Sequence, residues 1–370
     1  MIAIKNSKFF KDGQLITDAN VLIAEGLIQS ITTDIIPAGY EIIDGQGNYL
    51  SPGFIDLQIY GSGGNLFSAY PTVETLRQMD DDLVRKGTTG FLVCLATNTI
   101  AVFKEAIATA KAYRSEARAF LGLHLEGPYL NPKRLGAHPG ELVHKASLEE
   151  VKDLLEDAGG VVKMMTIAHE LQDKEVIDYI LGQGIVLSLG HSDANYEQAN
   201  LAFSSGFTTT THLYNAMPPI HHRNLNLPAA IFNHPVAMAS IIADGAHVDF
   251  EVVKMTYKLM PERLFLITDA VTTCIVGPYK HQLGETTYVM PDGTISGSKI
   301  TMLEAVDNCV KHCGIPLDVA LNMASERPAR LLKLGDKYGG VTVGKAADLV
   351  LLTDKLDLRK VFVAGLNISA

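Results

Sequence analysis

Titratable side chains follow several short apolar runs of this sequence. Glu126 closes the run that begins at Phe120, and His191 and His212 each come directly after a later run. One carboxylate with two imidazoles is a set that holds Zn²⁺ and leaves a coordination position open for water, as catalytic zinc sites do. An ion held in this way lowers the pKa of its water and polarises a carbonyl group. The three residues therefore predict a hydrolytic metal site.

Two further groups occupy the same kind of position. His247 ends the run that starts near Val236, and Asp269 follows the last run, in Ile267-Thr-Asp-Ala270. A carboxylate facing the metal could take the proton of the attacking water and return it to a leaving amine. One titratable group after a strand is ordinary, whereas a series of them in one chain indicates a shared site.

The apolar runs predict the elements that bring these residues together. Helical patterns fill most of the gaps between them, for example at 100–113, 148–155 and 249–259. Repeated strand and helix units imply parallel strands joined by right-handed crossovers, and eight units favour an α/β fold of the (β/α)8 TIM-like barrel type. In such barrels the catalytic groups lie where strands end. The eight runs begin near Pro52, Thr88, Phe120, Val161, Ile185, Thr208, Val236 and Arg263.

Both ends of the chain predict β structure outside the barrel. Residues 20–31 form two apolar runs around Glu25-Gly26, which is typical of a hairpin, and residues 348–352 and 361–363 resemble strands. Chain ends commonly lie close together. We therefore expect a small β-sandwich domain from residues 1–50 and 336–370, and a barrel from residues 51–335.

Composition excludes several functions. The 370 residues carry 31 basic and 41 acidic side chains, a net charge of −10, which is the wrong sign for binding nucleic acid. No apolar run reaches the roughly 20 residues of a membrane helix, so no membrane association is expected. The four cysteines form no Cys-x-x-Cys pair and no signal peptide is evident. A reduced, cytoplasmic protein is the expectation.

The sequence also resembles a known family. The chain is similar from end to end to the N-acetylglucosamine-6-phosphate deacetylase family of the amidohydrolase superfamily. The resemblance implies a metal-dependent hydrolase of amino-sugar metabolism that converts N-acetyl-D-glucosamine 6-phosphate to D-glucosamine 6-phosphate and acetate. The matching motifs are Pro52-Gly-Phe-Ile-Asp56, His124-Leu-Glu-Gly-Pro128, Gly190-His-Ser192, Thr211-His-Leu-Tyr-Asn-Ala-Met217, Ala243-Asp-Gly245 with His247, Thr268-Asp-Ala270 and Ser296-Gly-Ser298.

The resemblance also implies a role for individual residues. It makes Glu126, His191 and His212 the metal ligands, and Asp269 the general base and then acid. His138 would assist the metal in polarising the acetyl carbonyl. Arg223 would come from the neighbouring subunit of a homodimer and reach this site. The expected contacts to the sugar phosphate are Asn215, Ala216, Arg223 and His247, and the expected lining of the sugar pocket is Ala137, Ile295, Ser296 and Gly297.

Two departures from the family pattern matter. Gln58 and Tyr60 stand where many amidohydrolases carry a pair of histidines for a second metal, so one divalent ion per subunit is implied. Zn²⁺ is the expected ion, and Fe²⁺, Co²⁺ and Mn²⁺ are alternatives that the same ligands accept. After Arg223 the chain reads 224–227 Asn-Leu-Asn-Leu in place of the usual Pro-Gly turn. The placement of the arginine and the strictness for a 6-phosphate therefore stay open.

Other functions remain to be weighed. The chain could deacetylate a related N-acetylated amino-sugar phosphate or an N-acyl amino acid, or it could be a non-catalytic amidohydrolase-like scaffold. Scaffold proteins lose ligands and base, whereas Glu126, His191, His212 and Asp269 are all present. The histidines interpreted as structural or solvent-facing are His144, His169, His221, His222, His234, His281 and His312, with His169 held in reserve because it follows the fourth run.

Overall fold

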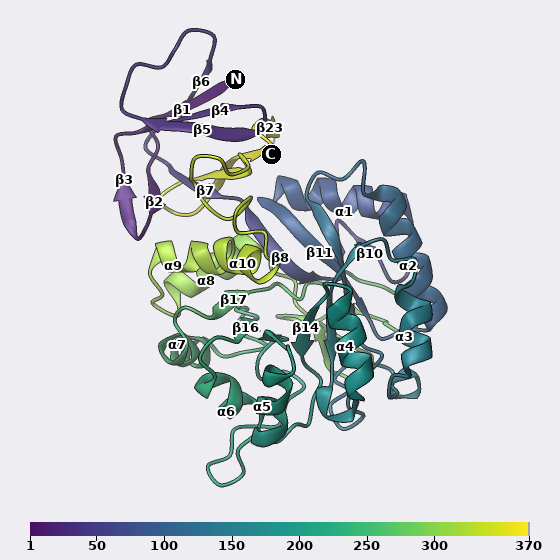
Figure 1. Ribbon diagram of the computed structural model, residues 1–370. Helices are drawn as coiled ribbons and strands as arrows, with labels where there is room; N and C mark the ends of the chain where they lie inside the picture. The colour runs from purple at the N-terminus through teal and green to yellow at the C-terminus, as the bar shows by residue number, and fades with distance from the viewer. Residues whose placement is uncertain (369–370) are drawn as a thin grey trace.

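Eight parallel strands lie beside one another in chain order, in a computed structural model that describes residues 1–368. Hydrogen bonds from Asp269 N to Gln58 O and from Tyr60 N to Ala270 O, both 2.9 Å, join the last strand's exit to the first strand. The prediction of a TIM-like barrel is confirmed (Figure 1). The strands are β8 (Phe54–Ile59), β11 (Thr88–Ala96), β12 (Phe120–Glu126), β13 (Val162–Ile167), β14 (Val186–Leu189), β15 (Thr209–Thr210), β16 (Met238–Ile241) and β17 (Leu264–Leu266).

Helices cover the outside of the barrel, and local signals set where they begin. The side chain of Thr99 accepts a hydrogen bond from Val102 N, and Ser147 does the same for Glu150 N, so each caps the helix that follows. The helices are α1 (Val73–Arg85), α2 (Ile100–Tyr113), α3 (Leu148–Leu155), α4 (Lys174–Gly182), α5 (Tyr196–Ser204), α6 (Leu227–Asn233), α7 (Phe250–Leu259), α8 (Met302–Lys311), α9 (Leu317–Met323) and α10 (Glu326–Leu331).

The barrel strands are buried on both faces. All nine residues of β11 are buried, as are all six of β8. Strands covered by helices outside and by side chains inside read as continuous apolar runs without alternation. This burial is why the runs of the sequence predict the strands within about two residues.

Both chain ends contribute to a β part at one end of the barrel (Figure 1). Its two sheets pack on a shared core to which Ile4 and Val21 contribute from one sheet and Leu349 and Phe362 from the other. The expected β structure from both termini is confirmed, whereas the boundaries at residues 50 and 336 stay predictions. The sheets have the orders β5-β4-β1-β6 and β23-β22-β21-β7, from β1 (Ile2–Lys5), β4 (Asn20–Ala24), β5 (Leu27–Thr32), β6 (Glu41–Asp44), β7 (Tyr49–Pro52), β21 (Leu349–Leu352), β22 (Leu358–Val363) and β23 (Leu366–Ile368).

The remaining strands of residues 1–368 form two small hairpins and one three-stranded sheet. β2 (Phe9–Lys11) pairs with β3 (Gln14–Ile16), and β9 (Gly61–Ser62) pairs with β10 (Asn65–Leu66). After β17, the strands β18 (Gln282–Leu283), β19 (Tyr288–Val289) and β20 (Ile295–Gly297) form a three-stranded sheet. This last sheet belongs to the long connection between β17 and α8 and bears on the site described below.

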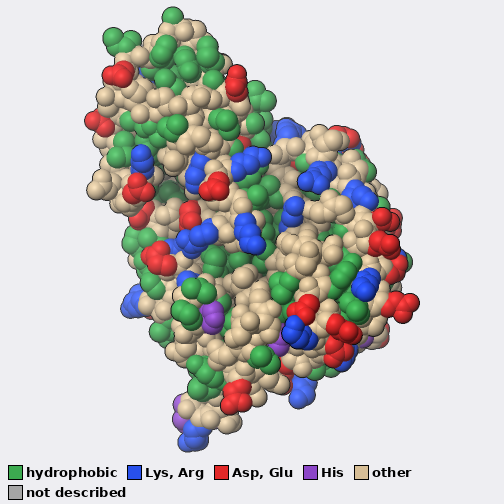
Figure 2. Space-filling model, viewed as in Figure 1, with side chains coloured by type: hydrophobic (Ala, Val, Ile, Leu, Met, Phe, Trp, Pro, Cys, Tyr) green, Lys and Arg blue, Asp and Glu red, His purple; other side chains and the backbone are tan. Residues whose placement is uncertain are grey.

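The surface mixes both signs of charge. Figure 2 shows acidic and basic side chains interspersed over the face of the barrel in view, and hydrophobic side chains on the terminal β part, where Ile35, Ile42 and Leu366 are exposed. Among residues 1–368, no helix has both the length and the apolar character that crossing a membrane requires. The four cysteines are free and buried.

Candidate active site

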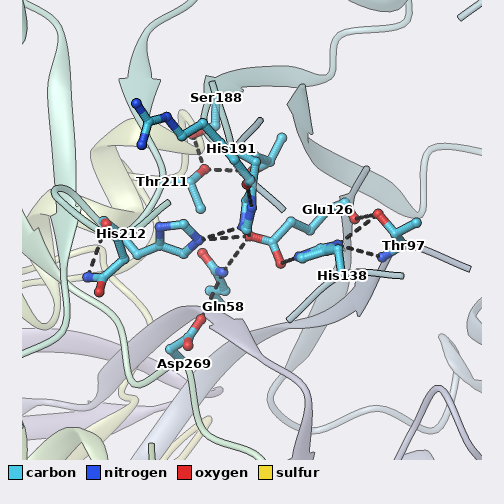
Figure 3. Close-up of polar contacts among 12 residues, drawn as sticks. Gln58, Thr97, Glu126, His138, Ser188, His191, Thr211, His212 and Asp269 are labelled. Atoms are coloured by element: carbon cyan, nitrogen blue, oxygen red, sulfur yellow. Dashed lines mark hydrogen bonds and ion pairs between the residues drawn. The ribbon is translucent and has the colours of Figure 1, made fainter. Parts of the chain in front are cut away.

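Three predicted ligands converge at the end of the barrel where the strands finish. Glu126 is the last residue of β12, and His191 and His212 lie two residues beyond β14 and β15. Glu126 Oε1 lies 3.3 Å from His191 Nε2 and 3.1 Å from His212 Nε2, and the two nitrogens are 3.1 Å apart. All three residues are buried. Figure 3 shows them pointing toward one another.

The spacing of these atoms fits a single metal ion. Ligands bonded to Zn²⁺ at about 2.0–2.1 Å in a tetrahedron lie roughly 3.3 Å from one another, close to the three separations here. The main-chain oxygen of Arg134 lies 2.8 Å from His191 Nδ1. Because a carbonyl only accepts, Nδ1 carries the proton and Nε2 keeps its lone pair for a metal. The donor set therefore fits a divalent cation.

Glu126 is held in its ionised form by its neighbours. Burial alone would raise its pKa, yet hydrogen bonds from His138, His191 and His212 and the charge of His191 hold the pKa of Glu126 well below its usual range. A carboxylate that stays ionised is the state that binds a cation. The electrostatics of the site thus agree with its geometry.

Gln58 and Tyr60 occupy the place beside Glu126. Gln58 Nε2 lies 3.1 Å from Glu126 Oε1, 2.9 Å from Asp269 Oδ1 and 2.7 Å from the hydroxyl of Tyr60. Tyr60 in turn donates to Glu126 Oε2. The Gln58 amide and the Tyr60 phenol thus fix both oxygens of the Glu126 carboxylate. The sequence alone indicates only that the histidine ligands for a second metal are missing at these two positions.

Asp269 lies three residues beyond β17 and faces the same space. Its Oδ1 accepts from Gln58, and its Oδ2 lies 4.0 Å from His247 Nε2. Burial raises the pKa of Asp269 above its ordinary value. His247 is oriented by Asp244, whose Oδ2 lies 2.7 Å from His247 Nδ1. Asp269 is therefore a carboxylate with one oxygen fixed and the other directed at the cavity.

His138 approaches from the loop after β12. The backbone N–H of Thr97 donates to His138 Nδ1 over 3.3 Å, and the Thr97 hydroxyl lies 2.8 Å from the same nitrogen. Burial lowers the pKa of His138 to about 4, so the ring is neutral at pH 7. With Nδ1 accepting, the single ring proton is on Nε2, which lies 3.3 Å from Glu126 Oε2. The ring thus presents a donor beside the candidate metal ligands (Figure 3).

A layer of polar groups lies beneath the ligands, inside the barrel. His124 Nε2 lies 2.7 Å from Thr166 Oγ1, which is 2.6 Å from Thr211 Oγ1, and Ser188 Oγ lies 2.5 Å from Thr211 Oγ1. These residues come from four strand segments and are completely buried. Buried polar groups that satisfy one another fix their positions. The layer therefore ties together the strands from which the ligands project.

The backbone at three site residues is unusual. His191, His212 and Asp269 have φ angles of 46°, 32° and 54°, in the left-handed region. Non-glycine residues avoid this region because Cβ approaches a carbonyl oxygen, and such residues cluster at functional sites. The chain turns sharply at the end of each strand and thereby directs these side chains into the cavity.

One cavity of about 140 Å³ contains the ligands and most of the predicted contacts. Arg223 and His169 do not line it. Arg223 is exposed on the loop before α6, which projects beside α5 and α6 (Figure 1). The lining includes Glu126, Ala137, His138, His191, His212, Asn215, Ala216, His247, Asp269, Ile295, Ser296 and Gly297, all predicted from the sequence, and also Tyr60, Tyr279 and His281.

Three residues at the site are not predicted from the sequence. Thr97, which holds His138, follows directly after β11, so the rule that functional groups follow strands could have found it. Tyr279 and His281 belong to the long connection after β17, where no local pattern predicts a return to the cavity. The sequence predicts a structural or solvent-facing role for His281, and the structure places this residue, buried, in the lining of the cavity.

Comparisons with known proteins agree with this geometry. The model of the amidohydrolase family matches residues 49–367. N-acetylglucosamine-6-phosphate deacetylase of Haemophilus influenzae is 33% identical over 98% of both chains, and that of Bacillus subtilis is 30% identical over 96% of this chain and 94% of its own.

Solved structures give the same result. The structure of N-acetylglucosamine-6-phosphate deacetylase from Pasteurella multocida has a TM-score of 0.95 at 31% identity and covers 100% of both chains. A mutant of the Mycobacterium smegmatis deacetylase, in complex with N-acetyl-D-glucosamine-6-phosphate, has a TM-score of 0.91 at 29% identity and covers 99% of this chain and 98% of its own. The chain therefore belongs to the amidohydrolase family, and these relatives within the family are N-acetylglucosamine-6-phosphate deacetylases.

Proposed function

We propose that this enzyme hydrolyses the acetamide of N-acetyl-D-glucosamine 6-phosphate, which yields D-glucosamine 6-phosphate and acetate. The observation that carries the proposal is the convergence of Glu126, His191 and His212 beside Asp269 and His138, in a chain whose full-length relatives bear the name of this activity. In this proposal the first three residues are the metal ligands, Asp269 is the base and His138 is the donor to a carbonyl oxygen. The scaffold alternative lacks support, because none of these groups has been lost.

Glu126, His191 and His212 would hold one divalent ion, and we propose Zn²⁺, with Fe²⁺, Co²⁺ and Mn²⁺ as alternatives. Such an ion, when bound, supplies a water of lowered pKa and polarises the acetyl carbonyl. The side chains of the protein orient the ligands and transfer the protons. Gln58 and Tyr60 keep the Glu126 carboxylate oriented toward the two imidazoles.

Asp269 and His138 act on opposite parts of the acetamide in this proposal. Asp269 takes the proton of the attacking water through Oδ2 and returns it to the amine nitrogen as the C–N bond breaks. His138 donates its Nε2 proton in a hydrogen bond to the carbonyl oxygen, on which negative charge develops. The hydrogen bonds of Thr97 keep the His138 ring in the tautomer that this requires.

The remaining predicted residues would hold the sugar phosphate. Asn215, Ala216 and His247 line the cavity, and we propose that they contact the phosphorylated sugar. Ala137 and residues 295–297 would form the wall against which the ring lies. Free, buried cysteines suit a reducing compartment, and we propose a cytoplasmic location.

A panel of N-acetylated compounds tests the proposed function. The purified, metal-loaded protein is assayed for acetate release from N-acetylglucosamine and N-acetylmannosamine, each with and without a 6-phosphate, and from an N-acetyl amino acid. We expect the highest kcat/KM for N-acetylglucosamine 6-phosphate. Preference for an N-acetyl amino acid would favour the alternative reaction, and no acetate release from any compound would favour the scaffold.

Arg223 provides a test of a shared site. We propose a homodimer in which this arginine, exposed on its own chain, reaches the phosphate in the neighbouring subunit. Charge-assisted hydrogen bonds contribute roughly 1.5–3 kcal/mol each, so Arg223→Ala should lower kcat/KM for the phosphorylated sugar about 10- to 100-fold. The unphosphorylated sugar should be turned over as before.

Mixing variants then shows which chain supplies the arginine. Arg223→Ala chains mixed with Asp269→Asn chains should form heterodimers with one complete site and recover activity. If activity does not recover although subunit exchange is verified, Arg223 acts within its own chain or the 224–227 segment has moved it from the site. His222→Ala, which alters the adjacent exposed residue, is the matched control.

A further inference from the structure

We infer that His281 determines specificity in this site by hydrogen bonding to a ring hydroxyl of the sugar. The inference rests on the proposed function and assigns a role to a residue outside the motifs that carry the family resemblance. His281 lies in the connection after β17, one residue before β18 (Gln282–Leu283), and lines the same cavity as Glu126 and Asp269.

The burial pattern of the connection singles out two residues. Residues 275–278, 280, 282 and 283 are exposed, whereas Tyr279 and His281 between them are buried. Both also line the cavity. The exposed segment therefore turns these two aromatic rings inward at the site, where Tyr279 also packs in a buried cluster with Tyr60 and Cys94.

His281 is held in a defined orientation. Its Nδ1 lies 2.9 Å from the hydroxyl of Ser296 in β20, and its main-chain oxygen accepts from Cys274 N over 3.1 Å. The ring stacks on Tyr279 with centroids 5.8 Å apart and 16° between the planes. Tyr279 is itself anchored, because its hydroxyl donates to the main-chain oxygen of Thr97 over 2.7 Å. A group that is fixed in this way loses little entropy when it binds a ligand.

The second ring nitrogen is available for a ligand. Within the described residues, Nε2 of His281 has no hydrogen-bond partner, and it is not among the buried polar atoms that are sealed from solvent. The residue is only 4% exposed and lines the cavity, and we infer that the open space that Nε2 reaches is this cavity. The ring therefore presents one hydrogen-bonding atom to whatever fills the site.

The position of the ring indicates which part of the substrate it meets. Tyr279 contacts both His138 and His281, with ring centroids 6.2 Å and 5.8 Å away, so its ring links His281 to His138, the proposed donor to the acetyl carbonyl. Its partner Ser296 belongs to the proposed wall of the sugar pocket. Burial also lowers the pKa of His281 to about 4, and a neutral imidazole does not match a phosphate dianion. A sugar hydroxyl fits this position.

The test combines His281→Ala with substrates that lack one hydroxyl. For N-acetylglucosamine 6-phosphate we expect KM to rise about 3- to 10-fold and kcat to stay within about threefold, because a hydrogen bond made equally before and during the reaction affects binding. His281→Gln, which keeps a polar group there, should recover part of the loss. Lys280→Ala and Gln282→Ala change the exposed neighbours and should leave KM unchanged.

The 3-deoxy and 4-deoxy analogues identify the hydroxyl. The wild-type enzyme should bind each analogue more weakly than N-acetylglucosamine 6-phosphate. The His281→Ala variant should bind one of the two analogues as well as it binds N-acetylglucosamine 6-phosphate, because the hydroxyl missing from that analogue is the one that His281 contacts. Equal losses of both analogues on the two proteins, or a fall in kcat without a change in KM, would overturn the role of His281. Wild-type protein that releases no acetate from the sugar phosphate would instead overturn the proposed function, and the inference with it.

Discussion

Replacing Asp269 with Asn should lower kcat about 10²- to 10⁴-fold while the affinity for the substrate stays within about threefold. An amide cannot accept the proton of the attacking water, yet Asn Oδ1 can still accept from Gln58, whose Nε2 lies 2.9 Å from Asp269 Oδ1. Asn also tolerates the left-handed backbone at this position better than most residues. Steady-state kinetics with calorimetric binding of N-acetylglucosamine 6-phosphate measure the two effects separately.

Asp244→Asn is the charge-matched control for this variant. Asp244 also has a buried carboxylate, but it orients His247 and does not line the cavity. Its loss should raise KM more than it lowers kcat. Near-normal kcat in Asp269→Asn would show that Asp269 is not the base.

His212→Ala should remove both the metal and the activity. The wild-type protein should contain one tightly bound divalent ion per chain, because Gln58 and Tyr60 fill the space beside Glu126 with their own hydrogen bonds. The alanine variant should bind that ion at least about 100-fold more weakly. Replacing a residue that only supports a metal ligand already lowers metal affinity about 10- to 100-fold, and His212 would be a ligand itself. Elemental analysis after dialysis gives the metal content, and circular dichroism shows whether the barrel is folded.

His169→Ala is the matched control for the metal prediction. His169 is buried and follows β13 as His212 follows β15, but it lies outside the cavity. This variant should retain the metal and near-normal activity. Two tightly bound ions per chain in the fully active wild-type enzyme, or a full metal load in His212→Ala, would contradict the assignment of the site.

The candidate metal site was predictable because its geometry follows from a local rule. Each ligand comes at or just after the end of a buried apolar run, and the ends of parallel barrel strands meet on one face. The helices at 100–113 and 148–155 were predicted with the observed bounds from their helical patterns, and in the structure the side chains of Thr99 and Ser147 cap them. Local chemistry and the repeated strand and helix pattern were sufficient for these features.

The contributions of Gln58 and His281 depend on contacts between distant parts of the chain. Gln58 meets Asp269 only because the first and last strands close the barrel, and the two are 211 positions apart. His281 reaches the cavity because Tyr279 bonds to Thr97, which is 182 positions away. No periodicity or motif in the sequence predicts these contacts between distant residues. Arg223 is a further case, because its proposed partner lies on another chain.

The left-handed backbone at His191, His212 and Asp269 narrows the routes by which evolution can change this site. Asn, Asp and His tolerate that conformation better than other non-glycine residues, whereas β-branched and bulky residues become outliers there. A glutamate introduced as a new metal ligand would cost roughly 1–2 kcal/mol for the backbone alone. We therefore expect that proteins descended from this chain keep Asp, Asn or His at these three positions, even where they bind another metal or catalyse another reaction. Other residue types should appear there more rarely, even when the new metal would prefer them as ligands.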